Sequence, residues 1–198
     1  MPDNERLQRQ IEFIVEVDKL KQVMRQTLIT GKSRRENAAE HSWHTALMAL
    51  ILLEYAEQPQ IDVLQVVKML LIHDLVEIDA GDTFCYDDHA REDQHERELQ
   101  AAARIFNLLP EDQAQRLRAL WEEFEGGQTL NSRFAQALDR LQPLINNYYT
   151  QGKAWQKHAV TKHQVVARNC TINDGAPKLW RYACKLIEDA VKTGILLE

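Results

Sequence analysis

Four residues that are far apart in the chain could together bind a metal ion: His41, the neighbouring pair His73 and Asp74, and Asp139. Each lies on or at the end of a segment with the helical spacing of apolar residues. Two imidazoles and two carboxylates form a mixed nitrogen and oxygen ligand set. Such a set suits a hydrated divalent transition metal better than a thiolate-bound structural zinc ion. If the four side chains converge, the sequence predicts an enzyme that activates water with a metal ion.

The position of the His73–Asp74 pair makes it more than a chance dipeptide. The pair directly follows Met69–Ile72, an apolar segment that we expect to be buried. Burying two polar groups without partners would cost several kcal/mol, and a metal ion is one way to satisfy both. The alternative, which the residues alone leave open, is that His73 and Asp74 only cap a helix end.

Asp139 has a similar setting, because Leu138 and Leu141 indicate an apolar helix face beside it. Pro143 removes the hydrogen bond to the Asp139 carbonyl and favours a kink at this point of the helix. Two ordinary interpretations remain open here as well: Asp139 could pair with an arginine, and His41 could be exposed to solvent.

The composition limits the classes of protein that the chain can belong to. A chain of 198 residues with 44% apolar residues can form a single domain with a sizeable core. A formal charge of −6 argues against a protein that binds duplex nucleic acid. The three cysteines show no CxxC spacing and indicate a reducing compartment. Without a signal peptide or a membrane-spanning apolar run, we expect a soluble, cytoplasmic protein.

The elements that must position the candidate ligands are all helical, since apolar residues recur at steps of three and four and strand-like alternation is scarce. We therefore expect an all-α, single-domain helical bundle. The first expected helix covers residues 7 to 24, and its apolar pattern weakens towards residue 31. The others cover 43–53, 61–72, 99–106, 110–121, 134–145 and 177–194. Asp174 and Pro177 are expected to start the last one. Loops are expected at 30–38, at 79–88 and at Gly126–Gly127.

The order of several short motifs resembles the HD-domain phosphohydrolases, in particular the branch with bacterial 5′-deoxynucleotidases and the HD-domain-containing-2 proteins. These motifs are Arg35–Ser42, His73–Glu77, Gly81–Asp82 and Leu138–Asp139. The resemblance covers a motif-bearing core of about residues 8–150, within one HD domain over 1–198. The C-terminal helical extension, about 151–198, carries none of the motifs.

The resemblance implies roles for individual residues. His41, His73, Asp74 and Asp139 are the implied ligands of one divalent metal ion, typically manganese, cobalt or a similar transition ion. Glu77 and Asp82 correspond to the carboxylates that share general acid and base work. The family is all-helical and commonly dimeric, so we expect a homodimer.

Arg25 corresponds to the arginine of the family's first-helix motif, which holds the phosphate, and a guanidinium fork matches phosphate oxygens well. Gln26 and Arg35 are further candidates for substrate contacts. Gln26 departs from the family pattern, because the deoxynucleotidases carry a tryptophan there that is proposed to sense the sugar. A preference for 2′-deoxy substrates is therefore not implied.

Taken together, these features lead us to expect a metal-dependent phosphomonoesterase that acts on a small phosphate ester, a (deoxy)nucleoside 5′-monophosphate, with no nucleic acid or membrane as partner. An alternative keeps the metal site but hydrolyses a phosphodiester, a nucleoside triphosphate or a guanosine-tetraphosphate-like nucleotide. An alternative of another class is a non-catalytic helical binding protein in which the metal only links helices.

Overall fold

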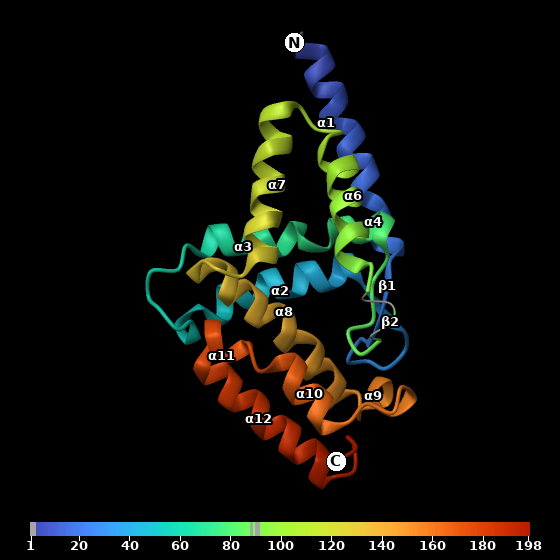
Figure 1. Ribbon diagram of the computed structural model, residues 1–198, viewed down its shortest axis with the longest axis vertical. Coiled ribbons are helices and arrows are strands. Elements are labelled where there is room, and N and C mark those ends of the chain that lie inside the picture. The colour runs from blue at the N-terminus through green and yellow to red at the C-terminus, as the bar shows by residue number, and fades with distance from the viewer. Residues whose placement is uncertain (1–2, 88, 90–91) are drawn as a thin grey trace.

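The computed structural model describes residues 3–87, 89 and 92–198, and it is built almost entirely of helices (Figure 1). The α-helices in chain order are α1 (Asp3–Val17), α2 (Ala38–Leu52), α3 (Val63–Ile72), α4 (Glu77–Ala80), α6 (Gln94–Phe106), α7 (Glu111–Gly126), α8 (Leu130–Tyr149), α9 (Lys153–Lys157), α10 (Lys162–Asn169), α11 (Ile172–Gly175) and α12 (Pro177–Lys192). Short 3-10 turns are η1 (Asp18–Gln22), η2 (Leu53–Tyr55) and η3 (His73–Val76). The expected all-α class is confirmed.

Helix α8 lies at the centre of the molecule and contacts α2, α3, α7, α11 and α12. Thr129 starts it with a reciprocal capping box, in which its side chain accepts from the Ser132 backbone and Ser132 accepts from the Thr129 backbone. Phe134, Leu138 and Leu141 form its fully buried face. Helices α2 and α3 cross the middle of the molecule, and the N- and C-termini lie at opposite ends (Figure 1). The central helix therefore touches most of the elements that surround the candidate ligands.

The expected first helix is too long, because α1 ends at Val17 and Met24–Leu28 forms the strand β1 instead. This strand pairs antiparallel with β2 (Arg35–Asn37), which lies inside the expected loop at 30–38. The connecting turn is closed by hydrogen bonds between Ile29 and Arg34 and between Lys32 and Ile29. Pairing between two segments stabilises this hairpin, so the apolar spacing of either segment alone did not reveal it.

The loop expected at 79–88 starts later than predicted, because Asp79 and Ala80 still belong to α4, and residues 81–87 form neither helix nor strand. Asp88, its last expected residue, lies outside the described residues, as do Met1 and Pro2. Pro110 precedes α7, and Gly127 ends it in the left-handed conformation with φ 59°, as the break at Gly126–Gly127 predicted. No described helix is long and apolar enough to cross a membrane.

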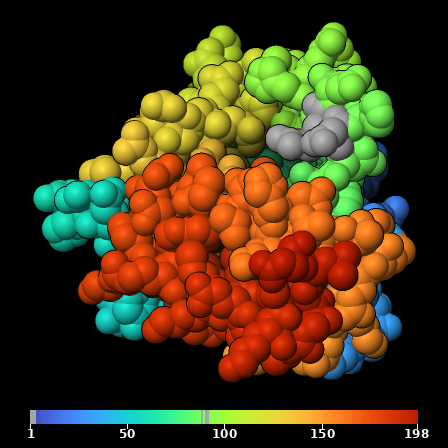
Figure 2. Space-filling view, turned by 60° about the horizontal axis from the view of Figure 1, so that its bottom comes forward, coloured from blue at the N-terminus to red at the C-terminus, as the bar shows by residue number. Residues whose placement is uncertain are grey.

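The C-terminal helices α9 to α12 pack against α8 and gather over one face of the molecule (Figure 2). Gly175 in α11 lies so close to α8 that a Cβ atom there would stand 2.2 Å from the Arg133 carbonyl oxygen. The predicted start of the last helix needs a correction. Asp174 belongs to the short helix α11, and Ala176 occupies the N-cap position before Pro177.

Candidate metal centre

The candidate ligands come from three helical segments that contact one another. His41 lies in the first half of α2, His73 and Asp74 open the turn η3 directly after α3, and Asp139 lies in the middle of α8. The preceding part of α3 is deeply buried, and this holds η3 in place. Helix α8 continues through Pro143, whose ring leaves the Asp139 carbonyl without its helical donor.

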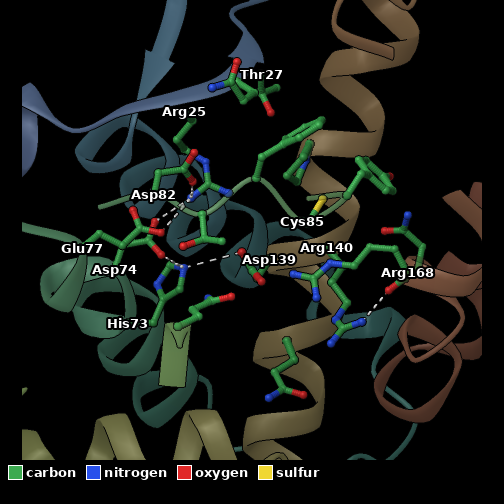
Figure 3. Close-up of a pocket in the computed structure, with 18 of the residues that line it drawn as sticks. Arg25, Thr27, His73, Asp74, Glu77, Asp82, Cys85, Asp139, Arg140 and Arg168 are labelled. Atoms are coloured by element: carbon green, nitrogen blue, oxygen red, sulfur yellow. Dashed lines mark hydrogen bonds and ion pairs between the residues drawn. The ribbon is translucent and has the colours of Figure 1, made fainter. Parts of the chain in front are cut away.

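The structure brings these side chains together, and Figure 3 shows His73, Asp74 and Asp139 close to one another. Nε2 of His41 lies 2.9 Å from Oδ1 of Asp139, and Nε2 of His73 lies 3.6 Å from the same oxygen. Ligand atoms of His41, His73 and Asp139 all lie within 4.8 Å of one another. Asp74 adds Oδ1 at 3.1 Å from Nε2 of His73. The four side chains therefore converge, which is the condition that the sequence set for a metal site.

The hydrogen bonds of His73 fit a metal ligand. Its Nδ1 donates to the Leu70 carbonyl oxygen at 2.9 Å, which leaves Nε2 with a lone pair when the ring is neutral. Nε2 is buried and forms no well-directed hydrogen bond within the part of the chain that the structure describes. A lone pair facing the carboxylates of Asp74 and Asp139 requires a cation or a proton between them. The donor set therefore fits a divalent transition ion.

The pKa shifts of His73 and Asp139 indicate the same need for positive charge at this site. Burial lowers the pKa of His73, but the charges of Asp74 and Asp139 outweigh burial and raise it to about 9. Burial alone would raise the pKa of Asp139, but its interactions with the His41 and His73 rings lower it well below its ordinary value. The site is thus built to hold a positive charge at the point where the imidazoles meet the carboxylates.

Sequence reasoning missed the group that orients His41, which is Gln142 on α8. Nδ1 of His41 donates to Oε1 of Gln142 at 3.0 Å, and Nε2 of Gln142 donates to Oε1 of Glu36 at 2.6 Å. Nε2 of Gln142 also lies 3.2 Å from Nδ1 of His44, so His44 contacts the site through Gln142. These contacts direct Nε2 of His41 towards Asp139.

Arg25 lies buried among carboxylates on the side of the site opposite α8 (Figure 3). Its Nη1 donates to Oδ2 of Asp74 at 2.9 Å and lies 3.7 Å from Asp82 and 4.0 Å from Glu77. Its Nε lies 4.0 Å from Glu36. Burial lowers the pKa of Arg25, but the neighbouring acids outweigh burial and raise it. One guanidinium therefore compensates several acids at once.

The two candidate acids both have a raised pKa. Burial, followed by the charge of Asp74, raises the pKa of Glu77 well above its ordinary value. Burial also raises the pKa of Asp82, which Arg25 opposes only in part. A raised pKa is typical of carboxylates that act as acids or bases in an active site.

A cavity of about 440 Å³ adjoins the cluster. Arg25, Gln26, His73, Asp74, Glu77, Asp82 and Asp139 line it. Arg35 is not among the lining residues, which does not support the substrate contact expected for it. Neighbouring residues of a strand point to opposite faces, and in β2 the next residue, Glu36, is the one buried towards the site.

The cavity has further walls that the sequence did not indicate. Phe124 lines the cavity and packs on the His73 ring with ring centroids 4.7 Å apart. The C-terminal extension contributes Ala154, Trp155, Arg168 and Asn169. Arg140 faces the cavity from α8, and its Nη1 donates to the backbone oxygen of Arg168. The last fifty residues, which carry no motif, thus form part of the pocket.

Comparisons with known proteins identify relatives of the chain. A family model described as HD domain matches residues 17–180. The human protein named 5′-deoxynucleotidase HDDC2 is 29% identical over 136 residues, which are 68% of this chain and 65% of that protein. This chain therefore spans less than two thirds of the length of that relative.

Two solved structures are similar over most of the chain. A protein of Magnetospirillum magnetotacticum MS-1, described as a predicted metal-dependent phosphohydrolase, is 50% identical, with a TM-score of 0.95 over 100% of this chain and 99% of that one. A conserved hypothetical protein of Pyrococcus furiosus is 24% identical, with a TM-score of 0.64 over 92% of this chain and 99% of that one, and it shares the fold.

Proposed function

Because the chain belongs to the HD-domain family, we propose that it is a metal-dependent phosphohydrolase that releases phosphate from nucleoside 5′-monophosphates. The observation that carries this proposal is the meeting of His41, His73 and Asp139 within 4.8 Å at the wall of a cavity. The names of the human and Magnetospirillum relatives support the same class of reaction. In this proposal residues 1–198 act as a single domain.

His41, His73, Asp74 and Asp139 would hold one manganese, cobalt or similar ion. When bound, such an ion supplies an activated water at neutral pH and offsets the negative charge of the phosphate. Gln142 orients His41, and the Leu70 carbonyl orients His73, so both rings present Nε2 to the same point.

Glu77 and Asp82 would share the proton transfers, one accepting the proton of the attacking water and the other protonating the leaving oxygen. Oε2 of Glu77 is buried and has no hydrogen-bond partner among the described residues, so it is available to accept a proton. Arg25 would hold these acids in place and contact the phosphate, and Gln26 would contact the rest of the substrate from the cavity wall. Arg35 has no role in the proposal because it does not line the cavity.

The test is a phosphate-release screen with full-length protein loaded with Mn²⁺ or Co²⁺. Nucleoside monophosphates are expected to yield free phosphate, and Asp74→Asn is expected to abolish the release. Asp112→Asn is the matched control, since Asp112 is exposed and pairs with Arg6 on the surface. Pyrophosphate released from triphosphates would instead favour the alternative hydrolase. A metal-loaded protein that melts at a higher temperature but hydrolyses no phosphate ester would favour the non-catalytic binding protein.

We also propose a homodimer that pairs through α2. Trp43, Leu47 and Leu50 form a stripe on one side of this helix, and Trp43 and Leu50 are 63% and 59% exposed. Light scattering is expected to give twice the chain mass, and Trp43→Asp is expected to give a monomer. Leu64→Asp in α3, which alters another exposed leucine, is expected to leave the dimer intact. A cytoplasmic location and the absence of nucleic-acid or membrane partners stay predictions from the sequence.

A further inference from the structure

We propose that Arg140 and Arg168 form an anion-binding subsite that holds a phosphate group of the substrate in the part of the cavity built by the C-terminal helices. The identity of the ligand as a nucleotide rests on the proposed function. The subsite itself rests on the charges and contacts of the two arginines.

The rest of the cavity offers little positive charge to an anionic substrate. Arg25 lies within 4.0 Å of Asp74, Glu77, Asp82 and Glu36, so these acids already balance its charge. A divalent ion would offset only part of the remaining acid. A substrate phosphate that enters this cavity therefore needs cationic groups elsewhere.

Arg140 and Arg168 are two cations of the cavity wall without an acidic partner among the described residues. Neither forms an ion pair among the described residues. The carboxylate next to Arg140 in the chain is Asp139, but that group is engaged by His41 at 2.9 Å and lies 3.6 Å from His73. Both arginines are half-buried and line the cavity, so solvent screens them less than it screens surface arginines.

The two arginines are held near each other by the fold (Figure 3). Arg140 donates to the backbone oxygen of Arg168, which ties α8 to α10. Helix α10 is itself started by a capping box between Thr161 and Gln164. Two guanidiniums placed together repel each other, and an anion bound between them removes this repulsion. Their planar donor forks match phosphate oxygens in pairs.

Phosphate of two origins could occupy the subsite. It could be the phosphate that is hydrolysed, reaching from the metal centre towards α10, or a second phosphate on the same nucleotide. A cavity of about 440 Å³ lies within the range of small-molecule sites, about 300–1,000 Å³. The shared chemistry is a phosphate dianion, and the choice of substrates separates the two origins.

The first experiment measures the binding of inorganic phosphate to full-length, metal-loaded protein by calorimetry. Arg140→Gln and Arg168→Gln are each expected to weaken binding about tenfold or more, and Arg168→Lys is expected to recover part of the loss. Arg181→Gln is the control, because it removes an exposed arginine of α12 outside the cavity. If both glutamine variants keep the metal content and melting temperature of the parent and bind phosphate as Arg181→Gln does, the inference is overturned.

The second experiment compares kcat/KM of Arg168→Gln on a nucleoside 5′-monophosphate and on the corresponding 3′,5′-bisphosphate. Equal losses on both indicate that the subsite holds the hydrolysed phosphate, and a larger loss on the bisphosphate indicates a second phosphate. No loss on either contradicts the inference while leaving the proposed hydrolase intact. The opposite result is also possible: the parent protein hydrolyses no ester, while both glutamine variants bind phosphate more weakly than the parent. In that case the proposed function fails and the subsite stands.

Discussion

Replacing Gln142 with leucine tests whether the hydrogen bonds behind the ligands control the metal site. Gln142 is fully buried, and the change keeps a similar volume while removing the partner of His41 Nδ1 and leaving Glu36 Oε1 with only the longer hydrogen bond from Asn146 at 3.4 Å. Each buried group left without a partner costs about 1–3 kcal/mol. One ring nitrogen left without a partner predicts a loss of about 1–3 kcal/mol in the free energy of unfolding. Because His41 also loses its fixed orientation, metal affinity is expected to fall about 10–100-fold.

The assay pairs urea denaturation with metal titration followed by calorimetry. Gln136→Leu is the matched control, since Gln136 lies on the same helix and donates to the Phe124 carbonyl at 2.6 Å without touching a candidate ligand. It is expected to lower stability by about 1 kcal/mol and to leave metal affinity unchanged. A folded Gln142→Leu protein that binds the metal as tightly as the parent would refute the argument that Gln142 orients His41.

Three other perturbations test contacts described above. Arg25→Met leaves Asp74 and its neighbouring acids without a compensating positive charge. Urea denaturation at pH 7 should therefore show a free energy of unfolding that is lower by about 3–5 kcal/mol, and this difference should shrink at lower pH as the acids are protonated. Since the folded pKa of His73 is raised from 6.5 to about 9, its protonated form stabilises metal-free protein fully below pH 6.5, and this contribution disappears as the pH rises through 9. Metal affinity should rise about tenfold per pH unit in that window, because binding displaces the proton, and an affinity independent of pH would contradict this. Gly175→Ala places a Cβ atom 2.2 Å from the Arg133 carbonyl oxygen and should cost about 1–3 kcal/mol of thermal stability, whereas Gly126→Ala, with open space around it, should be nearly neutral.

The part of the site that the sequence reveals is the part with a local signal. His73 and Asp74 stand out because two polar residues follow an apolar run, and Asp139 stands out beside a buried helix face. Gln142 and Glu36 have no such signal. A glutamine on a helix is ordinary, and its importance depends on His41, which lies 101 residues away in the chain. The strand β1 was missed for a related reason, since only its pairing with β2 distinguishes it from a continued helix.

The balance of charge explains why the motif-free C-terminal helices matter to this pocket. The motifs that the family resemblance draws on supply acids and ligands, and their one buried arginine, Arg25, is surrounded by carboxylates. A site of this kind holds a cation well but repels an anionic substrate. The two cavity-lining arginines that form no ion pair among the described residues are Arg140 of α8, beside a candidate ligand, and Arg168 of α10, in the extension. Since α10 packs on α8, the segment without motifs places its arginine at the cavity next to the candidate ligands, where the proposed subsite would select among phosphate esters without altering those ligands.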